Sequence, residues 1–585
     1  MAYNSSTGIS TAKVVIPTGG TDLILYFKET GGRAITDIKL IRPGYAANTT
    51  QTFTNEFLSA IEPFQTLRLM DYLNTNWSLF ANTSERLAKF GPTMEWSERT
   101  PKTKPTQEGP AGGSIEYMVE LANTADKDLW LNIPHLASED YLRNLANYLK
   151  SNLEPERKVY LEFSNEAWNF AVFAQPKMVL DQASAYIASG QLPLLNNPTS
   201  NEYYYTRRFT LKRAVDTSLI FREVFGNSAM MTRIRPVFAD QVGNPEQMSN
   251  ALMWLNRSYA NPPSYYLYGL AGAPYYVSAN GGTIDQIIAG ISERINARMG
   301  GEISHPGELR LAYYYTLAQA YGLENLSYEG GLDLQYIKDQ KLADLATVIA
   351  VSYDSRLEEV TAGYLRQWYA CGGDGFMYFN LTSVFNDHGQ WGLTDDILRD
   401  YQSPSAMNPK MKGARKVVAE DARTFECARF GTGFYAKTAD GVLGDGTGLT
   451  GTYYQDAEFG TVAVTRVDPV INFVWANFLT GNPYPDKNAY GAVKYFSARW
   501  RGQVLPKFSG TYTFGVDAES DDTASLTVGG QALGRGGQVV MEAGTKYDIE
   551  ITYKPNATGG RARLWWELPG KQVRAMIPES QLYPP

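Results

Sequence analysis

Residues 159–170 place an acid, an amide and an aromatic ring directly after a β-rich run. The stretch reads Val-Tyr-Leu-Glu-Phe-Ser-Asn-Glu-Ala-Trp-Asn-Phe, so the apolar residues give way to Asn165 and Glu166 and then to Trp168. A carboxylic acid can protonate a leaving oxygen, an amide can hold a sugar hydroxyl, and an aromatic ring can stack on a pyranose. These residue types suit cleavage of a bond between two sugars.

A second glutamate ends another short apolar run. Residues 326–331 read Leu-Ser-Tyr-Glu-Gly-Gly, which places Glu329 at the end of a predicted strand. Two carboxyls about 5–5.5 Å apart on facing walls of one site hydrolyse a glycosidic bond with retention, one protonated and the other ionised. We expect Arg68 to lower the pKa of Glu329 and Tyr275 to hydrogen-bond to the ionised Glu329. The nearby anion should raise the pKa of Glu166.

Polar residues also follow other predicted strands, and in a barrel such residues meet at one mouth. These residues are Arg68, Asp71, Asn132, His135, Tyr275, Tyr276, Asn380 and Trp391. Together with Asn165 and Trp168, most of them are candidates for binding the substrate.

The elements that would position these residues are eight short apolar runs between residues 36 and 425. Amphipathic helical patterns, such as Ser138–Leu153 and Leu309–Tyr321, separate most of the runs. Eight β-then-α units predict an α/β fold, a closed (β/α)₈ TIM barrel, with enlarged loops at Gly91–Gly113 and Gly190–Tyr203. The runs are Asp37–Arg42, Thr66–Asp71, Leu129–Pro134, Val159–Ser164, Met230–Val237, Tyr266–Ala273, Asn325–Glu329 and Gly375–Asn380.

The two ends of the chain differ from this pattern. Residues 1–35 contain two predicted strands, Lys13–Ile16 and Leu23–Phe27, which form either a hairpin that plugs the barrel or the remnant of a β-sandwich. Residues 426–446 are predicted to be a linker that leads into the Gly-rich stretch 444–448. Residues 447–585 predict a β-sandwich or barrel. Its strands are Tyr495–Trp500, Gly510–Val516, Ala524–Val528, Val539–Glu542, Tyr547–Tyr553 and Ala562–Glu567.

Composition narrows the classes of function. The chain has 585 residues, 44% hydrophobic and 19% charged, with a net charge of −8, which argues against nucleic acid as the main partner. No apolar run is long enough to span a membrane. Cys371 and Cys427 are too few for a disulfide framework or a zinc site, and their pairing is left open. The start lacks the pattern of a signal peptide, so we expect a trimmed mature form or export by another route.

Every candidate residue also has a purely structural interpretation. A lone glutamate at a strand end is usually solvated, and Arg68 or His135 can simply complete an ion pair or a hydrogen-bond network. Glu162 lies further back on its strand and is predicted to form a salt bridge. Asp240 and Asp387 are alternative acids on the same rim. The joint placement of two glutamates after the fourth and seventh strands favours the functional interpretation.

The two glutamate motifs resemble the signatures of clan A retaining glycoside hydrolases. The matching strings are Tyr-Leu-Glu-Phe-Ser-Asn-Glu (160–166) and Leu-Ser-Tyr-Glu-Gly (326–330). The resemblance implies that Glu166 is the acid/base, Glu329 the nucleophile, and Asn165 the residue that binds the sugar 2-hydroxyl. It also implies that Arg68 is the strand-two arginine and that Tyr275 or Tyr276 is the strand-six tyrosine.

Three further strings extend this resemblance. Ile-Arg-Pro-Gly (41–44), Ile-Pro-His (133–135) and Ala-Pro-Tyr (273–275) are similar to bacterial proteins described as cellulose-binding or glycosidase-like. Strand eight departs from the clan, because Tyr378-Phe379-Asn380 lacks the tryptophan that is common there. Trp391 is the candidate substitute.

The C-terminal region resembles a PA14 domain, a β module found on glycosidases, adhesins and toxins. The matching strings are Phe-Ser-Ala-Arg-Trp (496–500), Phe-Ser-Gly-Thr-Tyr-Thr-Phe (508–514), Ser-Asp-Asp (520–522) and Leu-Trp-Trp (564–566). In lectin members the Asp-Asp pair binds calcium, which then binds sugar hydroxyls, so Asp521 and Asp522 are candidate calcium ligands. The alternative is a polar turn in a packing module without calcium.

The resulting prediction is a retaining hydrolase of β-glycosidic bonds in a polysaccharide, extracellular or on a cell surface, that requires no cofactor. The PA14 domain would aid carbohydrate binding or shape the site. The alternative is a non-catalytic carbohydrate-binding adhesin on a cell or virion surface. Glutamates far apart or buried in ion pairs would favour this alternative.

Overall fold

The computed structural model describes most of the chain. The described residues are 2–15, 28–29, 32, 38–76, 93–104, 106–190, 202–242, 245–259, 261–278, 280–300, 314, 317–318, 321–420, 442, 444–468, 471–474, 496–518, 520–555, 561–569, 574–577 and 579–585. They divide into two compact units, Met1–Thr54 and Asn55–Pro585. No helix among them is long and apolar enough to cross a membrane.

The first unit contains a short antiparallel hairpin, β1 (Ala2–Asn4) and β2 (Ile9–Thr11). The prediction of a strand at Lys13–Ile16 is wrong for residues 13–15, which form none, while Ile16 and Leu23–Phe27 lie outside the described residues.

The predicted first barrel strand, Asp37–Arg42, is likewise wrong for residues 38–42, which form no strand; Asp37 is not described. Ile38 and Leu40 are 60% and 71% exposed, so this apolar run does not supply a buried strand. The run alternates apolar and charged residues and is too short to specify burial by pattern alone.

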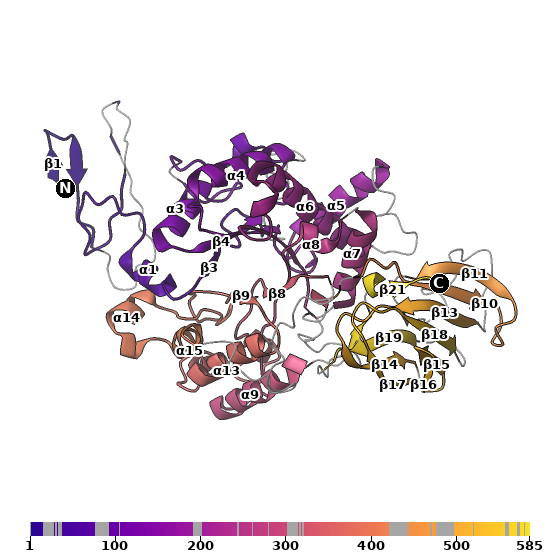
Figure 1. Cartoon of the computed structure of the whole chain (residues 1–585). Helices are drawn as coiled ribbons and strands as arrows, with labels where there is room; N and C mark the ends of the chain where they lie inside the picture. The colour runs from indigo at the N-terminus through magenta and orange to yellow at the C-terminus, as the bar shows by residue number, and fades with distance from the viewer. Residues whose placement is uncertain are drawn as a thin grey trace. The chain divides into compact units, whose positions relative to one another are not determined.

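The second unit begins with a parallel sheet whose seven strands follow one another in chain order (Figure 1). Each of the other seven predicted apolar runs overlaps one of its strands. The two edge strands, β3 and β9, are not paired with each other in the described part of the chain. The fold is therefore a curled α/β sheet, a TIM-like half-barrel. The strands are β3 (Thr66–Arg68), β4 (Asp128–Ile133), β5 (Val159–Phe163), β6 (Ile234–Ala239), β7 (Gly269–Gly272), β8 (Glu324–Ser327) and β9 (Gly375–Phe376).

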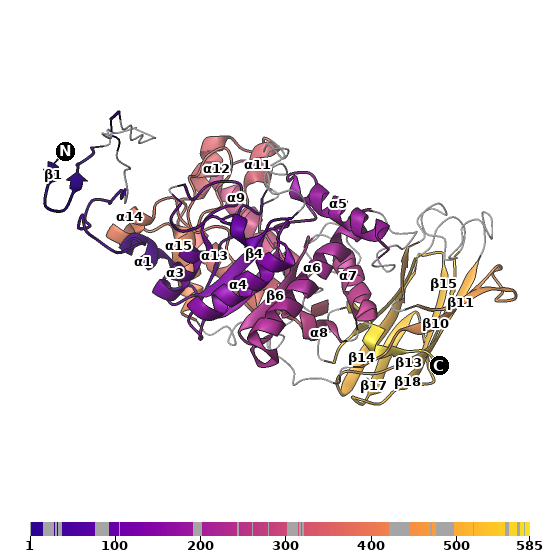
Figure 2. The same cartoon turned by 90° about the horizontal axis from the view of Figure 1, so that it is seen from above.

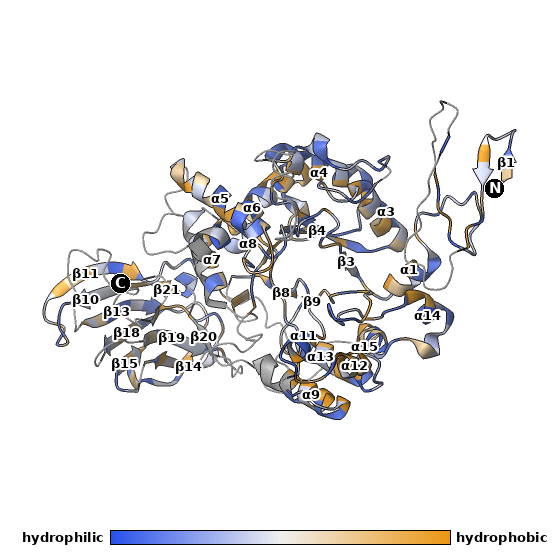
Figure 3. Ribbon diagram, turned by 180° about the vertical axis from the view of Figure 1, so that it is seen from behind, coloured by the Kyte–Doolittle hydropathy of each residue, from blue (hydrophilic) through white to orange (hydrophobic). Residues whose placement is uncertain are grey.

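Helices alternate with the strands along the chain and lie around the sheet (Figures 1 and 2). In α4, Ser138 caps the first turn by accepting a hydrogen bond from Tyr141 N at 3.1 Å, and Leu142, Leu145 and Leu149 form a buried stripe. Figure 3 shows the resulting apolar and polar faces on single helices. The helices are α1 (Asn55–Ile61), α3 (Ile115–Ala125), α4 (Glu139–Asn152), α5 (Gln175–Ala188), α6 (Glu202–Phe225), α7 (Pro245–Ser258), α8 (Pro263–Tyr266), α9 (Ile284–Gly300), α11 (Gln335–Asp339), α12 (Leu345–Val351), α13 (Leu357–Ala370), α14 (Ile397–Gln402) and α15 (Pro409–Val418).

The alternation of side chains along the strands decides which residues face the inside of the curl. On β4, Leu129, Leu131 and Ile133 pack in the cluster with the surrounding helices, whereas Trp130 belongs to a separate inner cluster with Tyr160. The period of two along a strand therefore brings the polar residues of alternate positions to the same inner face.

The C-terminal region, from Leu449 onward, consists of two antiparallel sheets. All six strands that were predicted there are confirmed. One sheet contains β10 (Leu449–Tyr454), β11 (Val462–Asp468), β13 (Ser497–Val504), β15 (Thr523–Val528), β16 (Gln531–Gly534), β18 (Tyr547–Lys554) and β21 (Leu582–Tyr583). The other contains β12 (Asn472–Val474), β14 (Gly510–Asp517), β17 (Gly536–Met541), β19 (Arg561–Glu567) and β20 (Arg574–Met576).

A buried aspartate on β11, Asp468, forms hydrogen bonds to side chains of β10 and β13 in the larger sheet. Asp468 Oδ2 accepts hydrogen bonds from Tyr453 Oη at 2.6 Å and from Trp500 Nε1 at 2.8 Å, and Arg466 Nε donates to Oδ1 at 2.7 Å. A Cβ at Gly451 would lie 2.2 Å from Asp468 Oδ2, so the neighbouring strand needs glycine at this position. Both carboxyl oxygens of residue 468 therefore act as acceptors in this network.

Replacing Asp468 with Asn should destabilise this domain by about 1–3 kcal/mol, because in either orientation the amide nitrogen would face a group that can only donate, Trp500 Nε1 or Arg466 Nε. Differential scanning calorimetry of the full chain should show one transition lowered by about 2–8 °C per kcal/mol. The exposed Asp548, which accepts a hydrogen bond from Gln503, provides the matched control Asp548→Asn. Equal transition temperatures for the two variants would contradict this role of Asp468.

Candidate active site

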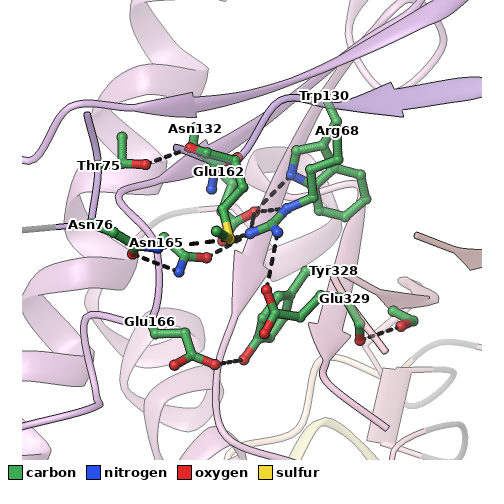
Figure 4. A network of polar contacts seen from close by, with 12 residues as sticks. Arg68, Thr75, Asn76, Trp130, Asn132, Glu162, Asn165, Glu166, Tyr328 and Glu329 are labelled. Atoms are coloured by element: carbon green, nitrogen blue, oxygen red, sulfur yellow. Dashed lines mark hydrogen bonds and ion pairs between the residues drawn. The ribbon is translucent and has the colours of Figure 1, made fainter. Parts of the chain in front are cut away.

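The inner face of the half-barrel carries a buried network centred on Arg68, the last residue of β3 (Figure 4). Its guanidinium binds Glu162 through two parallel contacts, Nε to Oε2 and Nη2 to Oε1, both at 3.0 Å. Nη2 also donates to Asn165 Oδ1 at 2.7 Å, and Nη1 approaches Glu329 Oε2 at 3.4 Å. One arginine therefore contacts residues from β5, from the segment after β5 and from the end of β8.

Glu162 is the structural partner of Arg68, as its place on the strand predicted. Both side chains are almost completely buried, and Trp130 Nε1 donates to Glu162 Oε2 at 2.7 Å. Burial acts to lower the pKa of Arg68, but Glu162 and Glu329 together raise it above its usual value. Glu162 binds the Nε and Nη2 side of the guanidinium in bidentate geometry, which leaves Nη1 for Glu329.

Glu329 follows β8 and is 8% exposed. Tyr275 Oη donates to Glu329 Oε1 at 3.0 Å, so the predicted tyrosine contact is present. Ser327 Oγ donates to the backbone oxygen of Glu329 at 2.8 Å, which holds the turn after the strand. The carboxylate thus has a cation on one oxygen and a neutral donor on the other.

Glu166 follows β5 and has a positive φ of 44°, a backbone conformation that residues other than glycine rarely adopt. Its Oε1 accepts a hydrogen bond from Tyr328 Oη and its Oε2 accepts one from Asn169 Nδ2, both at 2.8 Å. Both donors are neutral, in contrast to the cation beside Glu329. Strained backbone of this kind is often found where a side chain must be aimed at a functional site.

The electrostatics of the two glutamates are linked. Burial and the nearby Glu166 raise the pKa of Glu329 to about 7, although Arg68 and Tyr275 act to lower it. Burial also raises the pKa of Glu166, against the hydrogen bonds from Asn169 and Tyr328. Arg68 acts to lower the pKa of Glu329, as predicted, but burial and Glu166 outweigh it, so the net shift is upward. Burial therefore acts against ionisation of both carboxyls.

Asn165 is held from both ends of its amide. Its Oδ1 faces Arg68, and its Nδ2 donates to Asn76 Oδ1 at 2.8 Å. Gln175 Nε2 donates to the backbone oxygen of Asn165 at 3.0 Å. Because arginine can only donate, the amide oxygen must point to Arg68, and the second N–H of Nδ2 remains for a ligand. Asn76 was not predicted, since nothing in its sequence neighbourhood marks it.

The two candidate tyrosines that follow β7, Tyr275 and Tyr276, lie in different environments. Tyr276 is 1% exposed, lies in the hydrophobic core, and bonds through Oη to Thr361 at 3.0 Å and Tyr378 at 3.2 Å. This placement favours packing over contact with a substrate. Tyr275 is the residue directed at the glutamates, as alternation along an extended segment requires.

Tyr275 also belongs to a row of aromatic rings. The Phe379 ring lies 6.5 Å from the Tyr275 ring and 5.9 Å from the Trp391 ring, both nearly edge to face. The Phe379–Asn380 peptide bond is cis. Asn380 Oδ1 is buried without a hydrogen-bond partner, and Asn380 O accepts from Leu393 N at 2.8 Å. The half-buried Trp391 is therefore connected to the site through Phe379.

The remaining candidates lie around the network in different settings. Asn132 Nδ2 donates to Ser164 O at 2.8 Å and braces the end of β5. His135 is 2% exposed, while Trp168 is half-buried with its Nε1 shielded from solvent. Asp71 Oδ1 accepts from the backbone of the Asn76 loop at 2.8 Å. These residues shape or surround the network rather than contact the two glutamates directly.

The alternative acids are engaged elsewhere. Asp240 is buried and binds Arg207 Nε through both carboxylate oxygens, at 2.7 and 3.0 Å. The side chain of Asp387 is 67% exposed and binds His388 Nδ1 at 2.8 Å. Neither contacts Glu166 or Glu329 through a hydrogen bond that the structure describes, which favours the glutamate pair.

The Asp-Asp pair of the C-terminal domain has one exposed and one buried member. Tyr553 Oη donates to Asp522 Oδ2 at 2.6 Å, and Arg535 donates to Asp522 O. No group of three or more His, Cys, Asp and Glu residues within the described ranges could hold a metal ion. Calcium takes six to eight oxygen ligands, more than Asp521 and Asp522 supply. A calcium role for this pair stays a prediction, and no step below depends on a metal.

Comparison with known proteins identifies the C-terminal region. The PA14 domain model matches residues 445–580. The chain is 36% identical over 151 residues to Anti-sigma-I factor RsgI3 of Acetivibrio thermocellus, which covers 24% of this chain and 22% of that protein. The chain therefore spans about a fifth of the curated relative that it matches.

Two solved structures give similar partial matches. An anti-sigma factor domain-containing protein from Clostridium clariflavum is 28% identical, with a TM-score of 0.21, over 24% of this chain and 47% of that chain. A PA14 sugar-binding domain from an RTX adhesin is 18% identical, with a TM-score of 0.19, over 25% of this chain and 100% of that chain. The chain thus combines a parallel α/β half-barrel with a C-terminal PA14 domain.

Proposed function

We propose that the half-barrel is a retaining glycoside hydrolase that cleaves β-glycosidic bonds in a polysaccharide. The observation that carries this proposal is the electrostatically linked pair Glu166 and Glu329, each with its own set of hydrogen-bond donors. Two carboxyls that share a proton at strand ends can divide the roles of acid and nucleophile. The closed (β/α)₈ form of the barrel belongs to the same proposal.

In the first step, a carboxylate oxygen of Glu329 attacks the anomeric carbon while the bond to the leaving oxygen breaks. Glu166 transfers its proton to that oxygen, and a covalent glycosyl-enzyme forms. Arg68 and Tyr275 both contact Glu329, and they favour the ionised carboxylate that this attack needs. Asn165 can donate its free N–H to the 2-hydroxyl of the same sugar.

In the second step, the ionised Glu166 removes a proton from a water molecule. The water oxygen attacks the anomeric carbon, the bond to Glu329 breaks, and the pair returns to its original protonation state. The half-buried Trp168 and Trp391 rings would pack on neighbouring sugar units. No cofactor is needed for either step.

We further propose that the PA14 domain contributes carbohydrate binding and that the protein works outside the cell or on its surface. Cys371 has no free thiol, which is typical of an oxidising compartment; Cys427 lies outside the described residues. A non-catalytic adhesin, on a cell or virion, is the second candidate, and the burial of Glu329 in an ion pair with Arg68, at 3.4 Å, is the observation that favours it.

Glu329→Gln should abolish turnover, and Glu166→Gln should reduce it by about 10²–10⁴-fold, because each removes one of the two groups that react. A panel of polysaccharides and aryl glycosides with reducing-sugar detection measures both. Glu223→Gln is the matched control, since this exposed glutamate forms an ion pair with Arg143 on the surface. Sugar binding without any turnover by the unmodified protein would favour the adhesin instead.

The pH dependence of hydrolysis should be bell-shaped, because the active state of the pair carries one proton. As pH falls through about 7, where burial and Glu166 place the pKa of Glu329, that carboxylate takes up a proton and can no longer attack the anomeric carbon. At high pH Glu166, whose pKa is raised by burial, loses the proton that the first step needs. Steady-state kcat/KM between pH 4 and pH 9 measures both limbs; a rate that stays level between pH 7 and pH 5 would contradict the role of Glu329 as the group that must be ionised.

A further inference from the structure

Tyr328 occupies an unusual place in this site. It immediately precedes Glu329 in the chain, yet its hydroxyl donates to the other glutamate, at 2.8 Å from Glu166 Oε1 (Figure 4). The side chain is 1% exposed and belongs to the inner cluster of the curl with Trp130 and Tyr160. The residue therefore links the ends of β5 and β8, which are not neighbours in the sheet.

The Tyr328 ring is fixed by the same cation that holds Glu329. The Arg68 guanidinium carbon lies 5.1 Å from the centre of the ring, within the range of a cation–π contact. Burial and the charge of Glu166 raise the pKa of Tyr328 well above its usual value. The raised pKa favours the protonated hydroxyl, which donates the hydrogen bond to Glu166.

Asn169, the other donor to Glu166, differs in an important respect. It lies three residues further along the same segment and moves with Glu166, so it cannot set the position of Glu166 relative to Glu329. Tyr328 comes from the opposite side of the pair. A donor on this side both limits how far the two carboxyls can separate and stabilises negative charge on Glu166.

We propose that Tyr328 is a positioning residue that holds Glu166 across the pair and favours its ionised form, so that it matters most when Glu166 acts as the base. This inference rests on the proposed hydrolase. In the first step Glu166 must give up a proton, which a hydrogen bond to the resulting carboxylate assists. In the second step Glu166 must start as the carboxylate, and loss of the donor leaves fewer molecules in that state.

The test of the kinetic role uses Tyr328→Phe with a dinitrophenyl glycoside of the sugar that the unmodified protein hydrolyses. Its leaving group needs no acid, so the first step should proceed almost unchanged. The second step should slow by about tenfold or more, the ratio expected for a hydrogen bond to a charged group. The variant should therefore show a burst of phenolate, with kcat and KM lowered together and kcat/KM preserved. Equal losses in kcat and kcat/KM would overturn the role.

Tyr353→Phe is the matched control. Tyr353 Oη also donates to a carboxylate, Asp395 Oδ2 at 2.9 Å, and Tyr353 is 47% exposed, in contrast to the buried Tyr328. The substitution removes the same kind of hydroxyl as Tyr328→Phe and should leave kcat and KM unchanged, with no new burst of phenolate. A burst in this variant as well would show that the effect is not specific to Tyr328.

A second measurement does not depend on activity. In protein labelled with ¹³C at the glutamate carboxyls, the signal that disappears in Glu166→Gln reports the protonation of Glu166. In Tyr328→Phe it should titrate about one pH unit higher, since the lost donor stabilised the ionised form. An unchanged titration would overturn the proposal for Tyr328. A shifted titration in a protein that cleaves no glycoside would support Tyr328 as the partner of Glu166 and contradict the hydrolase alone.

Discussion

The site depends on one buried ion pair, the fork of Arg68 on Glu162. A guanidinium inside a protein is tolerated only when its N–H groups are satisfied, and Glu162 and Asn165 take most of them. The pairing of β3, β4 and β5 in parallel register places Arg68 beside Trp130 and Trp130 beside Tyr160, which brings the inward residues of three strands together. The same guanidinium also contacts Asn165 and Glu329, so the ion pair fixes the cation around which these two residues lie.

The balance of charge between Arg68 and the carboxyls around it influences which carboxyls can be ionised. Three carboxyls, Glu162, Glu166 and Glu329, surround a single guanidinium, and Glu162 uses most of its charge. Ionising both remaining carboxyls in a buried setting carries a large electrostatic cost, which favours a state with one proton. In the proposed hydrolase, the structural ion pair would thereby create the condition under which the other two acids divide into a proton donor and a nucleophile. The same arginine that stabilises the sheet also orients the Tyr328 ring.

The sequence predicted those parts of the site that follow from strand periodicity. Strand ends mark Arg68, Glu166 and Glu329, and a position four residues before Glu166 marks Glu162 as the inner partner. Asn76 and the hydroxyl of Tyr328 could not be predicted, because their contacts join segments 89 and 162 residues apart. The prediction of a strand at residues 38–42 was wrong for a different reason. A short apolar pattern does not show whether other parts of the chain cover it, and Ile38 and Leu40 are exposed. The direction of the net pKa shift of Glu329 could not be predicted either, because it depends on burial and on the nearby Glu166.

In the described part of the chain, the edge strands β3 and β9 are not paired with each other, and the site does not need that pairing. The side chains that contact the two glutamates come from β3, the segment after β5, the segment after β7 and the end of β8. None comes from a strand between β9 and β3. Hydrogen bonds across the inner face, chiefly Arg68 to Glu329 and Tyr328 to Glu166, connect strands that the sheet itself does not pair. These cross-links can hold two carboxyls in fixed relation within a half-barrel, so the proposed chemistry requires the inner polar network more than it requires closure of the sheet.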